Sequence, residues 1–256
     1  MTLITGASGL LGGRLASLLA SGGLGVVAAR HRAAPPGALP SVPLDLTDAG
    51  SLAAILDRAR PQAVLHCAAQ ADPDRCEREP ALAQVLNVDA SARLARLCHR
   101  RGLRLVALST DLVFPGDRPN WRETDDPHPL LVYAQSKLGG ERAVLVEAPG
   151  AAVARIALVY GRGFGPRGTA SETIAWRLRA AQPVRLFTDQ YRTPVDPESV
   201  AQALAVLLRG DASGVFHLGG PERVSRYQLG LRVAELLGLP AEQIEAVTQA
   251  GEATAP

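Results

Sequence analysis

Tyr133 and Lys137 are four residues apart in the segment Val-Tyr-Ala-Gln-Ser-Lys, so on a helix their side chains would share one face. A tyrosine phenol, with a pKa near ~10, is a poor proton donor or acceptor at neutral pH. A neighbouring ammonium group favours the phenolate and lowers that pKa, which makes a tyrosine usable in general acid–base catalysis. Thr110 follows the apolar run 105–108, and a hydroxyl at the end of a strand can hold a reacting oxygen. We therefore predict proton transfer at this place.

Lys137 is the only lysine in the sequence. Arginine replaces lysine in most surface roles, but it lacks the compact ammonium whose pKa can be shifted. A general bias of the chain towards Arg, Ala and Gly weakens this argument without explaining why the one exception falls here. The alternative is a surface Tyr–Lys pair at helical spacing, and we favour the catalytic interpretation.

A glycine-rich turn follows the first predicted strand, residues 2–5. Gly6, Gly9 and Gly12 have the spacing G-x-x-G-x-x-G and precede an amphipathic helix that should end near residue 20. Glycines between a strand and a helix let backbone amides approach a pyrophosphate at the positive end of the helix. Alone, the glycines would indicate only a tight turn. Their place at the start of an alternating β/α pattern predicts a dinucleotide site.

The second predicted strand, residues 25–29, ends in Arg30-His-Arg32. In folds that bind NAD, an acidic residue near this point holds the ribose 2′-hydroxyl, whereas an arginine suits a 2′-phosphate. No acidic residue stands here. Arg30 and Arg32 therefore favour NADPH over NADH, and the alternative is an exposed basic loop.

The apolar runs predict strands that alternate with helices throughout the chain. Further strands are expected at 63–66, 103–108, 152–156 and 215–218, and helices at 48–60, 80–101, 171–181, 197–209 and 225–237. This alternation predicts an α/β protein with a doubly wound parallel (Rossmann) sheet and a smaller C-terminal substrate lobe. We expect a dinucleotide-binding domain over 1–158 and a substrate-binding lobe over 159–256, from which about 197–218 returns to the main sheet.

Composition excludes several classes of protein. The chain has 256 residues, 47% of them hydrophobic, and a net charge of +2, so nucleic-acid binding is not expected. The apolar runs are too short or too interrupted to span a bilayer, and no secretory signal precedes the first strand. The three cysteines have no metal-ligand spacing and are expected to be reduced thiols of a cytoplasmic protein without a metal site. The oligomeric state stays open, with a homodimer as one option.

With these motifs the chain resembles the extended short-chain dehydrogenase/reductases, and within them the dTDP-4-dehydrorhamnose reductase group. Ser-Thr-Asp-Leu-Val-Phe at 109–114 together with Tyr-x-x-x-Lys is characteristic of this group. The similarity covers nearly the whole chain and includes the segments 6–12, 45–46, 66–69, 87–90, 109–116, 121–125, 133–137 and 140–141.

This resemblance implies an NADPH-dependent reductase of a 4-keto nucleotide sugar, as in dTDP-rhamnose biosynthesis. It makes Thr110, Tyr133 and Lys137 the catalytic residues, with Tyr133 and Lys137 also contacting the cofactor. The implied cofactor site further contains Gly6, Ser8, Gly9, Leu10, Leu11 and Gly12 at the pyrophosphate, Asp45 and Leu46 at the adenine, and Ala68 and Ala69 at the nicotinamide. The implied substrate contacts are Thr110, Asp111 and Arg192.

The chain also departs from the reductase pattern. Leu158 stands where the reductases carry a tryptophan, and Arg192 stands where they usually have a small residue. An arginine there is more typical of the related epimerases and dehydratases, which use it on the diphosphate; the alternative is a salt bridge to a neighbouring acid. The chain is also similar to the regulatory β subunit of methionine adenosyltransferase, which binds NADP as a partner subunit. A regulatory role and an epimerase or dehydratase activity therefore remain alternatives.

Overall fold

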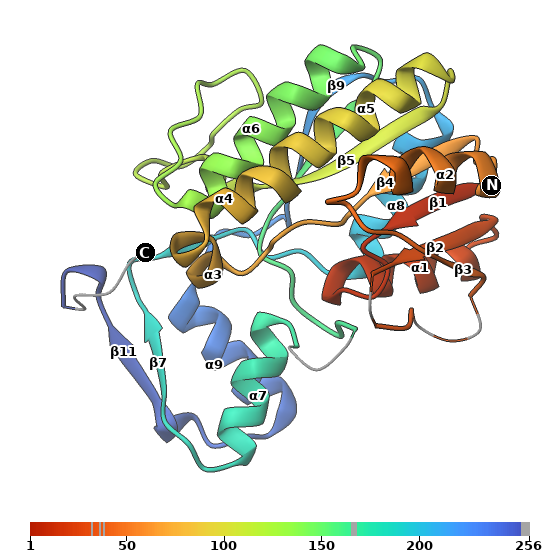
Figure 1. Ribbon diagram of the computed structural model, residues 1–256. Coiled ribbons are helices and arrows are strands. Elements are labelled where there is room, and N and C mark those ends of the chain that lie inside the picture. Colours follow the sequence, from red (N-terminus) through yellow and green to blue (C-terminus); the bar gives the residue numbers. More distant parts are fainter. Residues whose placement is uncertain (32, 36, 38, 165–167, 252–256) are drawn as a thin grey trace.

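The fold is organised around a parallel sheet that carries seven strands in the order β3-β2-β1-β4-β5-β6-β9 (Figure 1). The computed structural model describes residues 1–31, 33–35, 37, 39–164 and 168–251. The strands of this sheet are β1 Thr2–Thr5, β2 Val26–Arg30, β3 Ser41–Pro43, β4 Ala63–His66, β5 Arg104–Thr110, β6 Ala152–Ile156 and β9 Gly214–Leu218. After β3 the chain crosses back over β1 to form β4, and ligands of such sheets bind beyond the strand ends at this reversal.

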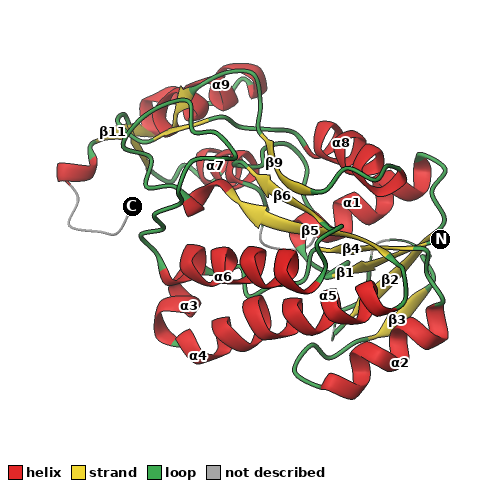
Figure 2. Cartoon of the chain, turned by 90° about the horizontal axis from the view of Figure 1, so that it is seen from above, coloured by secondary structure: helices red, strands yellow, loops and turns green. Residues whose placement is uncertain are grey.

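Helices cover both sides of the sheet, and the strands accordingly carry apolar side chains on both faces. Adjacent residues alternate between two cores, so that Leu105 packs on one face and Val106 on the other. Figure 2 shows α1 and α8 on one side and α2, α5 and α6 on the other. Their bounds are α1 Leu10–Ser21, α8 Pro197–Arg209, α2 Ala49–Ala59, α5 Ala90–Arg100 and α6 Val132–Glu147. The predicted doubly wound α/β fold is confirmed.

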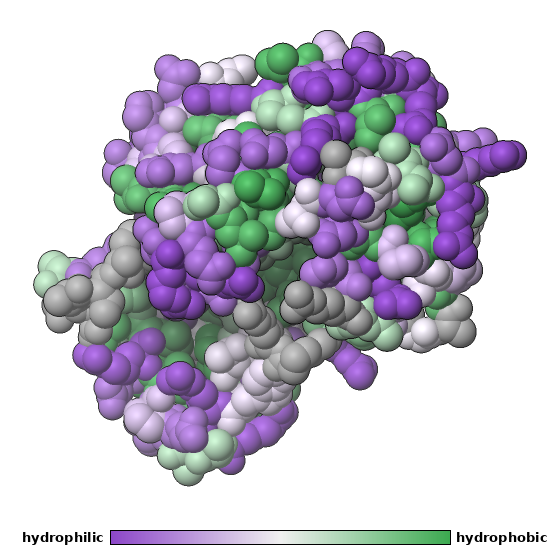
Figure 3. Space-filling model, in the orientation of Figure 1, coloured by the Kyte–Doolittle hydropathy of each residue, from purple (hydrophilic) through white to green (hydrophobic). Residues whose placement is uncertain are grey.

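A smaller lobe lies beside the carboxyl ends of the strands (Figure 1). It contains two short ribbons, β7 Val184–Phe187 with β11 Ile244–Val247 and β8 Tyr191–Arg192 with β10 Val224–Ser225. Two helices, α7 Ala170–Arg179 and α9 Arg226–Leu237, enclose a separate apolar core with the first ribbon. In the space-filling view a hollow separates this lobe from the main body (Figure 3). Although α8 and β9 lie between lobe segments in the sequence, β9 pairs with β6 in the main sheet.

The expected single helix over 80–101 consists of three segments. The chain forms α4 Pro80–Ala83, then the π-helix η1 Gln84–Asp89, and then α5. The edge strand β3, the helix α3 Pro73–Arg78 and the lobe strands were not expected, because each is only two to six residues long. Short 3₁₀ turns occur at η2 Asp111–Val113, η3 Ala241–Gln243 and η4 Gln249–Gly251. No described helix has the length and apolar character required to cross a membrane.

Candidate functional site

Thr110 and Tyr133 meet where β5 ends and α6 begins. Thr110 is the last residue of β5, and its Oγ1 accepts a hydrogen bond from the Leu112 amide at 3.2 Å. Burial raises the pKa of Tyr133 to about 12, a hydrogen bond with the Thr110 side chain opposes that rise, and the nearby Asp111 carboxylate adds to it. Tyr133 therefore holds its proton at neutral pH and can act as a proton donor.

Lys137 lies one helical turn beyond Tyr133. Its Nζ donates to the carbonyl of Leu108 at 2.7 Å. Burial lowers the pKa of Lys137 to about 8, while the Glu141 carboxylate opposes that fall. The largest effects on the Tyr133 pKa come from burial, Thr110 and Asp111. That Lys137 lowers the Tyr133 pKa accordingly stays a prediction.

Asn87, which the sequence analysis included only in a family motif, fixes α6 next to the end of β4. It lies in the π-helix, and a single π-turn inside a helix is frequent at functional sites. Its Oδ1 accepts from the Gln70 amide at 2.8 Å, and its Nδ2 donates to Ser136 Oγ at 2.8 Å. Ser136 Oγ in turn donates to the Tyr133 carbonyl at 2.7 Å. Asn87 thus positions the first turn of α6, which carries Tyr133.

The predicted dinucleotide turn has a shape that only glycine allows. Gly6 has a φ of +68°, and a Cβ there would lie 2.7 Å from the Ala68 backbone. A Cβ at Gly12 would lie 2.3 Å from the Gly6 carbonyl oxygen. Helix α1 has Gly9 as its N-cap, without a side-chain cap or an acidic residue in its first turn. The amides of Leu10 and Leu11 are therefore available to an anion, and Ser8 lies in the same turn. These residues fit a pyrophosphate.

The other predicted cofactor residues lie along the same carboxyl edge of the sheet. Arg30 ends β2, and its Nε donates to Ser41 Oγ at 3.4 Å, whereas Arg32 is outside the described residues. Asp45 and Leu46 follow β3, and the Leu46 carbonyl accepts from Arg93 Nη2 at 3.0 Å. Ala68 and Ala69 follow β4 beside the glycine turn.

The lobe reaches the catalytic residues through Arg192. Its Nε donates to Asp111 Oδ2 at 3.0 Å and its Nη2 contacts Asp111 Oδ1, which makes the ion pair bidentate. Arg192 also acts on Tyr133, whose pKa it lowers in opposition to burial. The contact with a neighbouring acid, named above as the alternative for Arg192, is thus present in the structure. Leu158 packs against the apolar core of the lobe.

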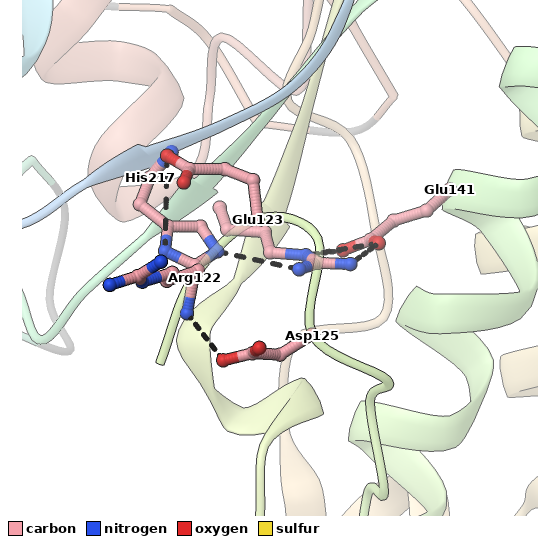
Figure 4. A network of polar contacts seen from close by, with 6 residues as sticks. Arg122, Glu123, Asp125, Glu141 and His217 are labelled. Carbon is pink, nitrogen blue, oxygen red and sulfur yellow. Dashed lines mark hydrogen bonds and ion pairs between the residues drawn. The ribbon is translucent and has the colours of Figure 1, made fainter. Parts of the chain in front are cut away.

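A buried ion pair behind the site was not anticipated. Arg155 on β6 pairs with Glu141 on α6, both side chains being at most 4% exposed, and Ser109 also donates to Glu141. Arg155 Nη1 donates to His217 Nε2 at 3.3 Å, and the His217 amide donates to Glu123 at 3.0 Å (Figure 4). This network joins α6, β6, β9 and the segment 111–131. Its members are far apart in the sequence, so no local pattern indicated it.

Comparison with known proteins identifies the family of the chain. The model of the RmlD substrate binding domain family matches residues 1–256. The chain belongs to this family. Among curated members of similar sequence, the probable low-salt glycan biosynthesis reductase Agl14 of Haloferax volcanii is 35% identical over 96% of this chain and 83% of that protein. The methionine adenosyltransferase 2 subunit beta of Xenopus laevis is 32% identical over 96% of this chain and 75% of its own length.

Solved structures show the same RmlD-type fold. A hypothetical dTDP-4-dehydrorhamnose reductase from Sulfolobus tokodaii superposes with a TM-score of 0.86 at 31% identity, covering 100% of this chain and 89% of that one. MoeE5 in complex with UDP-glucose and NAD superposes with a TM-score of 0.82 at 28% identity, covering 98% and 86%. The solved structures similar to this RmlD-family chain thus include a hypothetical dTDP-4-dehydrorhamnose reductase and a protein that binds UDP-glucose and NAD.

Proposed function

We propose that the protein is an NADPH-dependent reductase of a 4-keto nucleotide sugar, similar to the dTDP-4-dehydrorhamnose reductases. The observation that carries this proposal is the contact between Tyr133 and Thr110, at the strand edge where the glycine turn of α1 also lies. The glycine turn and the uncapped first turn of α1 fit the pyrophosphate, and Arg30 is suited to a 2′-phosphate. When bound, the nicotinamide supplies the hydride for carbonyl reduction.

The chain's own residues supply the proton and the orientation of the carbonyl. Tyr133 holds its proton at neutral pH and donates it to the carbonyl oxygen as negative charge develops there. Thr110 binds the same oxygen through its hydroxyl and keeps it within reach of the phenol. Lys137, charged below about pH 8, stabilises the phenolate that remains after proton transfer. Arg192 and Asp111, which pair with each other next to Thr110, are assigned to substrate binding.

A turnover assay tests the proposal. Purified protein should oxidise NADPH when given a dTDP-linked 4-keto sugar, and Tyr133→Phe should lower turnover roughly 10²- to 10⁴-fold with cofactor affinity unchanged. Tyr160→Phe is the matched control, since Tyr160 is exposed and outside the catalytic group. Native turnover by Tyr133→Phe would refute the proton-donor role.

The similarity to methionine adenosyltransferase 2 subunit beta supports a second candidate, a regulatory subunit that binds NADP. Such a protein would bind NADPH, remain inactive with every 4-keto nucleotide sugar tested, and co-purify with a larger enzyme from its host. Interconversion of a nucleotide sugar without net use of NADPH would instead indicate an epimerase.

A further inference from the structure

Two arginines lie where the ribbon of β8 and β10 meets α9: Arg192 in β8, and Arg226 directly after β10. In its antiparallel register Arg192 is opposite Val224, and Tyr191 is opposite Ser225. Side chains of a strand alternate between faces, so Arg192 and Val224 point to the same side, and Arg226 follows two residues after Val224 as the first residue of α9. The Arg226 amide donates to the Gln190 carbonyl at 3.0 Å, which extends the ribbon pairing to this residue.

Another arginine of the same segment occupies the opposite face. The guanidinium of Arg223 lies 3.5 Å from the centre of the Tyr191 ring. This contact agrees with the alternation, because Tyr191 and Ser225 share the face opposite to that of Arg192. Arg223 therefore has an aromatic partner on the other face of the ribbon, whereas Arg226 lies close enough to Arg192 and Asp111 to interact with both charges.

The charges on the Arg226 side of the ribbon are not balanced. Both carboxylate oxygens of Asp111 are already bound by nitrogens of the Arg192 guanidinium group. In the part of the chain that the structure describes, the Arg226 side chain has no ion pair or hydrogen bond. Burial and the charge of Arg192 both lower the pKa of Arg226, and Asp111 opposes them. Two guanidinium groups thus share one carboxylate in a partly buried place, and an unpaired charge there is unfavourable until an anion binds.

We propose that Arg226 is a substrate-binding residue which, together with Arg192, holds the diphosphate of the nucleotide sugar. This inference rests on the function proposed above. A diphosphate offers several oxygens and more than one negative charge, and guanidinium groups bind such oxygens in pairs. The Asp111 contact keeps Arg192 in place, so Arg226 supplies the uncompensated positive charge. The cap of α9 fixes its position, since Ser225 and Gln228 form a reciprocal capping box next to it.

Binding of nucleoside diphosphates tests this inference without turnover. Protein saturated with NADP is titrated calorimetrically with dTDP, UDP and dTMP. The wild type should bind dTDP or UDP more tightly than dTMP. Arg226→Gln should weaken the diphosphate by roughly 10- to 100-fold, because it removes a hydrogen bond between charged groups. Arg226→Lys keeps the charge and should lose less, and both variants should retain the NADP affinity of the wild type.

Arg223→Gln is the matched control, being three residues away on the other face of the ribbon. It should bind the diphosphate like the wild type. The inference is overturned if Arg226→Gln and Arg226→Lys keep the wild-type affinity, if Arg223→Gln loses as much, or if the wild type binds neither dTDP nor UDP. If Arg226→Gln loses diphosphate binding while no 4-keto sugar is reduced, the inference stands and the proposed reductase activity fails.

Discussion

Replacing Gly140 by alanine would test how precisely catalysis requires Tyr133 to be positioned. Gly140 lies where α6 passes the π-helix, and a methyl group there would be 2.3 Å from the Asn87 carbonyl oxygen. Carbon and oxygen atoms without a covalent bond approach to about 3.3 Å. Because the obstacle is backbone, α6 and the π-helix must separate by about 1 Å to accept the methyl group.

The separation affects catalysis more than stability. Asn87 binds Ser136, and Ser136 binds the Tyr133 carbonyl, so the displacement is transmitted to the catalytic residue. A misplacement of about 1 Å costs roughly 10²-fold in turnover. Overpacking destabilises by about 1–3 kcal/mol, and alanine recovers up to about 1 kcal/mol of helix propensity. We therefore expect Gly140→Ala to fold, to lose at most about 2 kcal/mol of unfolding free energy, and to lose most of its turnover.

Gly139→Ala provides the control. A methyl group at Gly139 would lie 3.0 Å from Val88 Cγ2, a side-chain atom of a half-buried residue, so a shift of only a few tenths of an ångström accommodates it. This variant should keep native turnover and stability. Turnover is followed by NADPH oxidation, the free energy of unfolding by urea titration, and cofactor affinity by fluorescence. Equal turnover in the two variants would refute the claim that the close contact between Gly140 and Asn87 positions Tyr133.

Three other outcomes are expected. Glu141→Gln leaves Arg155 buried without its charged partner and should lower the free energy of unfolding, measured in urea, by about 3–5 kcal/mol. Glu147→Gln, which removes an exposed pair with Arg96, should change that free energy little. Equal losses in the two variants would contradict the role of burial. Turnover should fall as the pH rises through about 8, because Lys137 loses its proton there while Tyr133, with a pKa of about 12, stays protonated. Turnover that does not change up to pH 10 would exclude a role for the Lys137 charge. Replacing Arg30 and Arg32 together by alanine should weaken NADPH and leave NADH nearly unchanged in a titration, whereas equal losses would exclude the 2′-phosphate assignment.

The main sheet could be predicted because its strands are buried on both faces. Residues 2–5, 63–66 and 152–156 form apolar runs between turn residues, and each became a strand with those bounds. Strand β3 contains a proline and lies exposed at the sheet edge, so its sequence resembles a loop. The lobe ribbons depend on pairing between segments far apart, such as 184–187 with 244–247, which periodicity does not reveal.

The candidate site likewise contains some residues that the sequence identifies and others that only the structure identifies. Tyr133 and Lys137 were identified because their relation is local, one turn apart on a helix. The role of Asn87 depends on a π-turn that shifts the helix by one residue, and no sequence pattern marked that shift. From the sequence, Arg226 is predicted only to lie in the helix at 225–237. Its proximity to Arg192 follows from the antiparallel ribbon, which only the structure defines.

The ionisation of Tyr133 bears on the direction of the chemistry. A reductase must give a proton to the carbonyl oxygen, whereas an epimerase that begins by oxidising a hydroxyl must first take one away. Burial and the charge of Asp111 both stabilise the neutral phenol, and Lys137 binds the Leu108 carbonyl. An epimerase would need Tyr133 as a phenolate. At neutral pH, however, Tyr133 is a neutral phenol. Arg192, which holds Asp111, instead lowers the Tyr133 pKa in opposition to burial, so this lobe residue favours release of the proton from Tyr133.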